Sequence, residues 1–180
     1  NYLNMDFAGN ETSLAGITNL VLKDKIDGPM TRLLLGYGSW NTLNAKLYNQ
    51  GKKGNFNYFI GANYEQSDYT DYGTDNSWLN MIDDPEYKKT KLYFKTTYFI
   101  EPDKQSVSLF AHHTQHTGDA GRPNRGFEHL YDTINATYKN QINDAWNLQL
   151  KAGYRYYNRS WEEDNFPDLS LREKGGVKQN

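Results

Sequence analysis

The chain has 180 residues, a formal net charge of −2 and no cysteine. The absence of cysteine excludes disulfide frameworks, Cys-ligated zinc and thiol catalysis within this sequence. The charge gives no basic footprint, so nucleic acid is not expected as a partner. A mean hydropathy of −0.92 would suit a disordered chain, but aromatic residues make up 15% of the sequence and disordered chains are poor in them. A β-barrel with a polar interior accounts for both values, because only a narrow outer band then faces lipid.

Residues 1–29 lack the regular pattern of the remainder. Residues 13–23 carry a short apolar run, and residues 24–29 (DKIDGP) are rich in turn formers. Asn1 is not followed by a charged and then apolar leader, so we expect a processed chain or, the alternative that we favour, a piece of a longer one. The sequence has no run of 18 apolar residues, and no transmembrane helix is expected.

From residue 30 onward, apolar and polar residues alternate in segments that predict successive β-strands. Such alternation places apolar side chains on one face of a strand and polar ones on the other. Strands are expected at 31–38, 42–49, 55–65, 89–100, 106–113, 129–139 and 146–157, with the beginning of another at 169–180. Gly51 and Gly54 bound an expected tight turn in which positive φ favours glycine.

Residues 146–157 (WNLQLKAGYRYY) show the clearest alternation. A strand of a soluble domain is usually nearer six residues, whereas long alternating segments flanked by aromatic residues are typical of outer-membrane barrels. The expected connections alternate in length as well. Short ones are expected at 51–54, 101–105 and 141–145, and long ones at 66–87, 114–126 and 158–169. This asymmetry is typical of bacterial outer-membrane barrels.

Three short strings carry a resemblance to a known family. Ala15 to Lys23 (AGITNLVLK) is similar to the Gly-Gly-Val-Ile-Asn-Ile-x-x-Lys-like end of the plug domain in TonB-dependent outer-membrane receptors. Gly36 to Ser39 (GYGS) resembles the end of the first barrel strand in that family, and Tyr64 to Ser67 (YEQS) the Tyr-x-x-Ser-like end of a later strand. Ala15 and Thr18 depart from the family pattern. The strand-and-loop rhythm extends the resemblance over most of the chain.

The resemblance implies an all-β fold, an antiparallel up-and-down transmembrane β-barrel of which this chain is the N-terminal portion. Residues 1–29 would be the end of the plug domain and a linker, and residues 30–180 the first seven to eight strands of a barrel of about 22. The family imports a scarce cargo across the Gram-negative outer membrane: a siderophore or other metal chelate, cobalamin or an oligosaccharide. Implied partners are outer-membrane lipid, a TonB-like periplasmic coupling protein that energises the plug, the small-molecule cargo and other envelope proteins. No cofactor is implied.

Six residues are candidates for cargo binding: Tyr72, Trp78, Lys91, Tyr93, Arg122 and Arg125. Aromatic and arginine side chains on the expected long loops, together with Tyr87 and Trp161, can stack on a cargo and form bidentate hydrogen bonds. Loop packing and anchoring near lipopolysaccharide is the equal alternative. Lys91 and Tyr93, with Lys95, face the expected lumen and suit an anionic cargo, although a polar lumen carries charges without any substrate.

Two clusters contain residue types that could bind a metal ion. Asp68, Asp71 and Asp75 lie on the first long loop, with Asp83 and Asp84 beyond them; calcium needs six to eight oxygens, but the EF-hand order is missing and a solvated loop is favoured. His112, His113 and His116 offer imidazoles to a transition metal, but His112 and His113 should point to opposite faces. No nucleophile elbow or phosphate-binding loop occurs, and an enzyme is not expected.

Three other classes stay open. A passive porin would lack a plug upstream of residue 1. A complete eight-stranded barrel, acting as an adhesin or structural protein, would fold from these 180 residues alone in detergent. A soluble ligand-binding barrel or sandwich would bury the apolar strand faces in a dry core.

Overall fold

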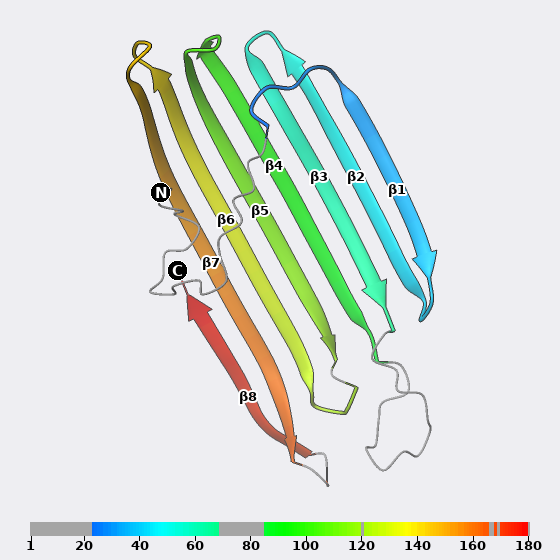
Figure 1. The fold of residues 1–180 in the computed structure, drawn as a ribbon. Helices are drawn as coiled ribbons and strands as arrows, with labels where there is room; N and C mark the ends of the chain where they lie inside the picture. The colour runs from blue at the N-terminus through cyan, green and yellow to red at the C-terminus, as the bar shows by residue number, and fades with distance from the viewer. Residues whose placement is uncertain (1–22, 69–84, 120, 166–167, 169, 180) are drawn as a thin grey trace.

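The computed structural model describes residues 23–68, 85–119, 121–165, 168 and 170–179. These residues form eight strands: β1 (Met30–Gly38), β2 (Thr42–Lys53), β3 (Phe56–Ser67), β4 (Tyr87–Glu101), β5 (Gln105–Asp119), β6 (Gly126–Gln141), β7 (Asn147–Asn165) and β8 (Ser170–Gln179). Each strand pairs antiparallel with the next, which gives one up-and-down sheet (Figure 1). The predicted all-β, antiparallel up-and-down architecture is confirmed. Within the described ranges, no helix is long and apolar enough to cross a membrane.

The register of the strands sorts side chains into two faces. Leu33 pairs with Leu47, Leu47 with Ala62 and Ala62 with Leu92. Because paired residues point to the same side of a sheet, these residues define one face, which we call the apolar face. It also carries Ile60, Phe94, Val107, Leu109, Ile134, Leu148, Leu150 and Tyr154. The opposite face, which we call the polar face, carries Lys46, Asn63, Lys91, Thr114 and Tyr131 in one row.

The apolar face is not buried. Leu35 is 71% exposed, Leu150 56% and Ile60 49%. Apart from Pro85, Ile26 is the one aliphatic or aromatic side chain buried from solvent among the described residues, and it precedes the first strand. The described sheet therefore has no apolar core of its own, in contrast to a soluble sandwich or barrel.

The strands are longer than the sequence pattern predicted. The expected turn at 51–54 is partly wrong: β2 continues through Lys53, and Gly54, with φ of 57°, makes the turn to β3. The long connections expected at 114–126 and 158–169 are also wrong, because β5 reaches Asp119 and β7 reaches Asn165. The connection from β5 to β6 is residues 120–125, and the connection from β7 to β8 is residues 166–169. The long connection between β3 and β4, residues 68–86, remains.

The short turns between β2 and β3, β4 and β5, and β6 and β7 lie at one end of the sheet (Figure 1). Residues 23–29 cross the polar face close to this end before β1 begins. Strands β1 and β8 form the two edges of the sheet. β8 pairs with residues 157–165 of β7 only, so residues 147–156 have no strand beyond them in the described part of the chain.

Candidate functional site

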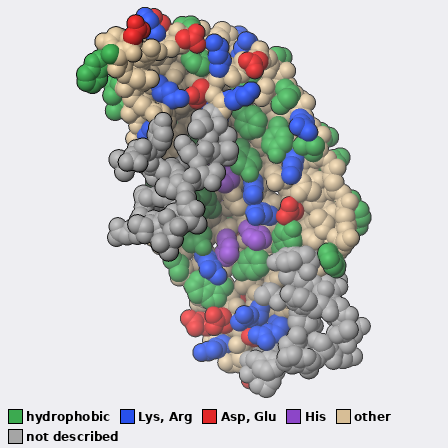
Figure 2. Space-filling view, in the orientation of Figure 1, with side chains coloured by type: hydrophobic (Ala, Val, Ile, Leu, Met, Phe, Trp, Pro, Cys, Tyr) green, Lys and Arg blue, Asp and Glu red, His purple; other side chains and the backbone are tan. Residues whose placement is uncertain are grey.

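The polar face is rich in cations. Four neighbouring rows on strands β1 to β7 contain Arg32, Lys46, Lys89, Lys91, Lys95, Arg155 and Arg159, with Glu65 as the carboxylate among them. Glu65 accepts hydrogen bonds from Asn44 Nδ2 (2.9 Å) and Tyr87 Oη (2.7 Å). Figure 2 shows Lys, Arg and His side chains gathered near the middle of this face. The excess of positive charge favours contact with an anionic molecule or an acidic protein surface.

Aromatic rings follow the same rows. Tyr93 stacks on His112 with ring centroids 4.8 Å apart and an interplanar angle of 11°. His112 in turn lies 6.4 Å from Tyr131, and Tyr131 lies 6.2 Å from Tyr157. The ring of Tyr48 covers Gly61, where an added Cβ would come within 2.9 Å of Tyr48 Cδ1. The polar face therefore carries neighbouring aromatic rings in the same rows as the cations.

Both sequence candidates on β4 belong to this surface. Lys91 lies between Asn63 and Thr114, and Tyr93 lies between Gly61 and His112. The sequence interpretation missed His129, Tyr131, Arg155, Tyr157 and Arg159 on the same face, although their positions follow the same alternation along β6 and β7. Tyr87 and Trp161 lie within β4 and β7 rather than on loops. Tyr72 and Trp78, like Asp71 and Asp75, fall outside the described residues.

The histidines divide between the faces as the alternation predicts. His112 and His116 lie on the polar face, whereas His113 lies on the apolar face, with Nδ1 2.6 Å from Asp132 Oδ1. His116 contacts Phe127 (5.0 Å between ring centroids) and His129 (6.0 Å). In the described ranges, no three histidine or carboxylate side chains are grouped closely enough to hold a metal ion.

Arg122 and Arg125, the two candidates between β5 and β6, both reach Asp164. Arg122 Nη2 lies 2.8 Å from Asp164 Oδ1, and Arg125 Nη1 lies 3.8 Å from the same oxygen. The Asp164 side chain is only 2% exposed. These contacts tie the connection between β5 and β6 to the end of β7, so both arginines have a structural role at this position.

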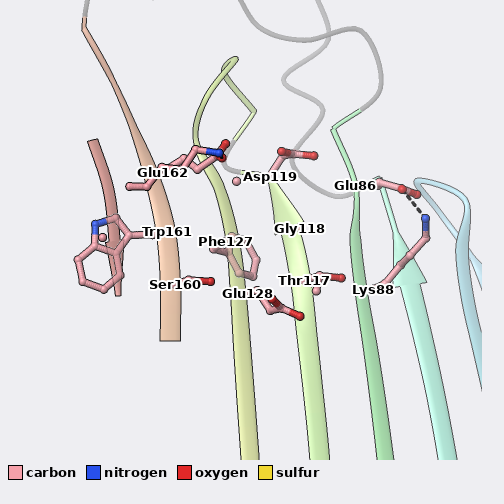
Figure 3. A pocket seen from close by; sticks show the side chains of 13 residues that line it. Glu86, Lys88, Thr117, Gly118, Asp119, Phe127, Glu128, Ser160, Trp161 and Glu162 are labelled. Carbon is pink, nitrogen blue, oxygen red and sulfur yellow. Dashed lines mark hydrogen bonds and ion pairs between the residues drawn. The ribbon is translucent and has the colours of Figure 1, made fainter. Parts of the chain in front are cut away.

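A cavity of about 520 Å³ lies at the end of the sheet where β5 connects to β6 (Figure 3). Its carboxylates include Glu86, paired with Lys88 (2.5 Å), and Glu162, paired with Lys174 (2.6 Å). Asp119 lies close to Glu162, since both approach the position that a Cβ would occupy at Gly126. By register, these charged side chains are on the side of the apolar face and beyond its apolar residues. The lining also includes Phe127 and Trp161, which by register lie on the polar face. Residues of both faces therefore border the cavity, but Lys91, Tyr93 and the two arginines do not.

Comparisons with known proteins do not add to this geometry. No family model matches the sequence, and no match was found among curated proteins or solved structures.

Proposed function

We propose that the chain is part of a transmembrane β-barrel in the bacterial outer membrane, and that this barrel is a TonB-dependent receptor. The observation that carries the membrane proposal is the exposed apolar face, with Leu35 at 71% and Leu150 at 56% exposure. Contiguous apolar surface of this extent is unusual on a soluble monomer. Contact with hydrocarbon removes it from water, while the polar face looks into the lumen.

Strand length supports the same proposal. Strands β4, β5, β6 and β7 have 15, 15, 16 and 19 residues. A tilted strand needs about 9–11 residues to cross the hydrocarbon, so each of the four is long enough to cross and to project beyond the bilayer. The projecting ends of β5, β6 and β7 are at the end opposite the short turns, which in such barrels is the extracellular side.

The open sheet favours a large barrel. In hydrocarbon every backbone N–H and C=O must be paired, so a spanning sheet cannot keep a free edge. The outer edge of β1 and residues 147–156 of β7 are free edges within the described residues. The two edges do not pair with each other in the described residues, which argues against a closed eight-stranded barrel and favours further strands, as in the 22-stranded transporters.

The cargo proposal rests on the resemblance to the receptor family and on the polar face. Lys91 and Tyr93 place a cation and a ring on the surface that would face the lumen. Such a surface suits an anionic cargo, for instance an acidic metal chelate. Tyr72 and Trp78 remain proposed contacts. Arg122 and Arg125 remain proposed contacts as well, and they would meet a cargo while paired with Asp164. Energised movement of a plug, driven by a TonB-like periplasmic protein, would release the cargo inward.

Fluorescence quenching by lipid tests the membrane proposal. Single cysteines introduced in place of Leu148 and Gln149, which point to opposite faces, are labelled with the same fluorophore in the full-length protein reconstituted in vesicles. Nitroxide-bearing lipid chains should quench the label in Leu148→Cys several-fold more than the label in Gln149→Cys. Equal quenching at the two positions would contradict the proposal.

Uptake in whole cells tests the receptor proposal separately. Cells that express the full-length protein are offered radiolabelled ferric chelates, cobalamin and oligosaccharides. An energised receptor accumulates its cargo against a gradient, and a protonophore abolishes the accumulation. Uptake that equilibrates and is insensitive to the protonophore would instead identify a passive conduit.

A further inference from the structure

Residues 23–29 are attached to the polar face before β1 begins. The backbone N–H of Ile26 donates to Asn57 Oδ1 on β3 (3.0 Å), and Gln50 Nε2 on β2 donates to the carbonyl of Gly28 (3.2 Å). The Ile26 side chain is 6% exposed. The segment is therefore packed against the sheet over several residues and does not merely lead into β1 (Figure 1).

Asp24 makes the strongest of these contacts. Its Oδ1 lies 2.8 Å from Lys95 Nζ on β4, and its Oδ2 lies 2.5 Å from Lys139 Nζ on β6. One carboxylate thus bridges two strands that are separated in the sheet by β5. The Lys95 side chain is 11% exposed and that of Asp24 25%, so solvent screens this bridge less than it screens a surface pair.

The electrostatics of Asp24 agree with a firm attachment. Burial by itself raises the pKa of the Asp24 carboxyl, but hydrogen bonds from Lys139 and Lys95, together with their charges, outweigh burial and hold the pKa below its ordinary value. The carboxylate is therefore ionised whenever the segment is in place at neutral pH. Lys25 adds an exposed contact to Asp103 in the turn between β4 and β5 (3.2 Å).

We propose that residues 24–28 are a strap fixed to the polar face, and that the bridge from Asp24 to Lys95 and Lys139 is the contact that holds it. Anything attached upstream can then move only about this fixed point, and the strap itself stays on the wall of the sheet. For a receptor this separates a moving plug from a stationary linker. This role in a receptor rests on the proposed function, whereas the attachment of residues 24–28 to the polar face does not depend on it.

Labelling of a buried cysteine tests the strap. The variant Ile26→Cys of the otherwise unchanged full-length protein, purified in detergent, should react slowly with a maleimide because position 26 is covered. Adding Asp24→Asn removes the charge and one acceptor, and labelling should become about tenfold faster or more, the factor expected for losing a charge-assisted hydrogen bond. Adding Lys95→Gln instead should have a similar effect.

Matched variants make the result specific. Asp27→Asn changes the same charge in the same segment, but the Asp27 side chain is 92% exposed, so labelling should stay slow. Lys104→Gln, which removes a lysine paired with Glu101, is the control for Lys95→Gln. Asp24→Glu should retain the protection. Fast labelling of Ile26→Cys alone, or equally slow labelling after Asp24→Asn is added, would overturn the strap, and neither result bears on whether the barrel imports cargo.

Discussion

Asp164 shows how much can depend on one buried carboxylate. Two arginines, Arg122 and Arg125, converge on its Oδ1 from the connection between β5 and β6. Its other oxygen, Oδ2, is buried without a hydrogen-bond partner in the described structure. Removing one partner of a buried ion pair leaves uncompensated charge, which is strongly destabilising locally. The arginines are partly exposed, so the effect should be confined to the connection.

We expect Asp164→Asn to loosen that connection and to expose the bond after Arg125 to trypsin. Arg122 is followed by Pro123, a poor site, so cleavage reports mainly on Arg125. Trypsin should cleave the folded Asp164→Asn variant about tenfold faster than it cleaves the unmutated protein. Asp168→Asn is the control, because Asp168 accepts hydrogen bonds from Ser170 instead. Unchanged cleavage after Asp164→Asn would show that the two arginines are held by other contacts.

The alternation of apolar and polar residues correctly predicted on which face of the sheet individual side chains lie. It did not predict which distant residues they contact. It separated His112 from His113 and placed Lys91 and Tyr93 on the polar face. It could not predict the contact of Arg122 with Asp164, which are 42 residues apart. A register shift opposite Glu163 and Asp164 leaves Arg172 as an extra residue on β8, so the alternation along β8 is broken at that point.

At the scale of strands, the sequence predicted the positions of the strand middles but not the residues at which the strands end. The predicted segment 106–113 belongs to a strand that ends only at Asp119, and 146–157 to one that ends at Asn165. The alternation between apolar and polar residues signals a strand where one face is apolar. Where both faces carry polar residues, as at Gln115, His116 and Thr117, the contrast disappears although backbone pairing continues. The sequence consequently predicted loops at these strand ends.

The strap should respond to pH in one direction only. Since the pKa of Asp24 is lowered below its ordinary 3.8 when the strap is in place, the stabilisation is present above about pH 4 and is lost as pH falls through the lowered value. The two groups that face Asp24, Lys95 and Lys139, keep their charge at these pH values. Because the Asp27 side chain is 92% exposed, a spin label attached to Asp27→Cys reports the backbone motion of the strap. Its spectrum should stay constant from about pH 7 to about pH 5 and become more mobile only at still lower pH.

The variant Asp24→Asn is the control for this titration. Without an ionisable group at position 24, the spectrum of the label should be mobile and nearly the same at every pH tested. A transition near pH 6 in the parent would instead implicate a histidine, and a transition that persists after Asp24→Asn would show that another group controls the strap.

At the scale of the molecule, the described part of the sheet has two faces of opposite character and no apolar core on either of them. One face is covered by exposed aliphatic and aromatic side chains, and the other carries stacked rings and cations. Burial of the apolar face is the main favourable term available to such a sheet, and neither the strand pairing nor the strap provides it. Folding of the sheet and its contact with an apolar environment should therefore be coupled.

This coupling predicts that the same substitution costs very different amounts of stability at two adjacent positions. Ile134→Arg places a charge on the apolar face near the middle of β6, whereas Asn135→Arg places it on the polar face. In lipid, arginine near the midplane should cost about 2–4 kcal/mol of stability, and a lumen-facing arginine far less. Chemical unfolding of the full-length protein from vesicles measures both. If the face were solvated, Ile134→Arg would be nearly neutral, because Ile134 is already exposed in the isolated sheet. Such a result would remove the basis for placing this chain in a membrane.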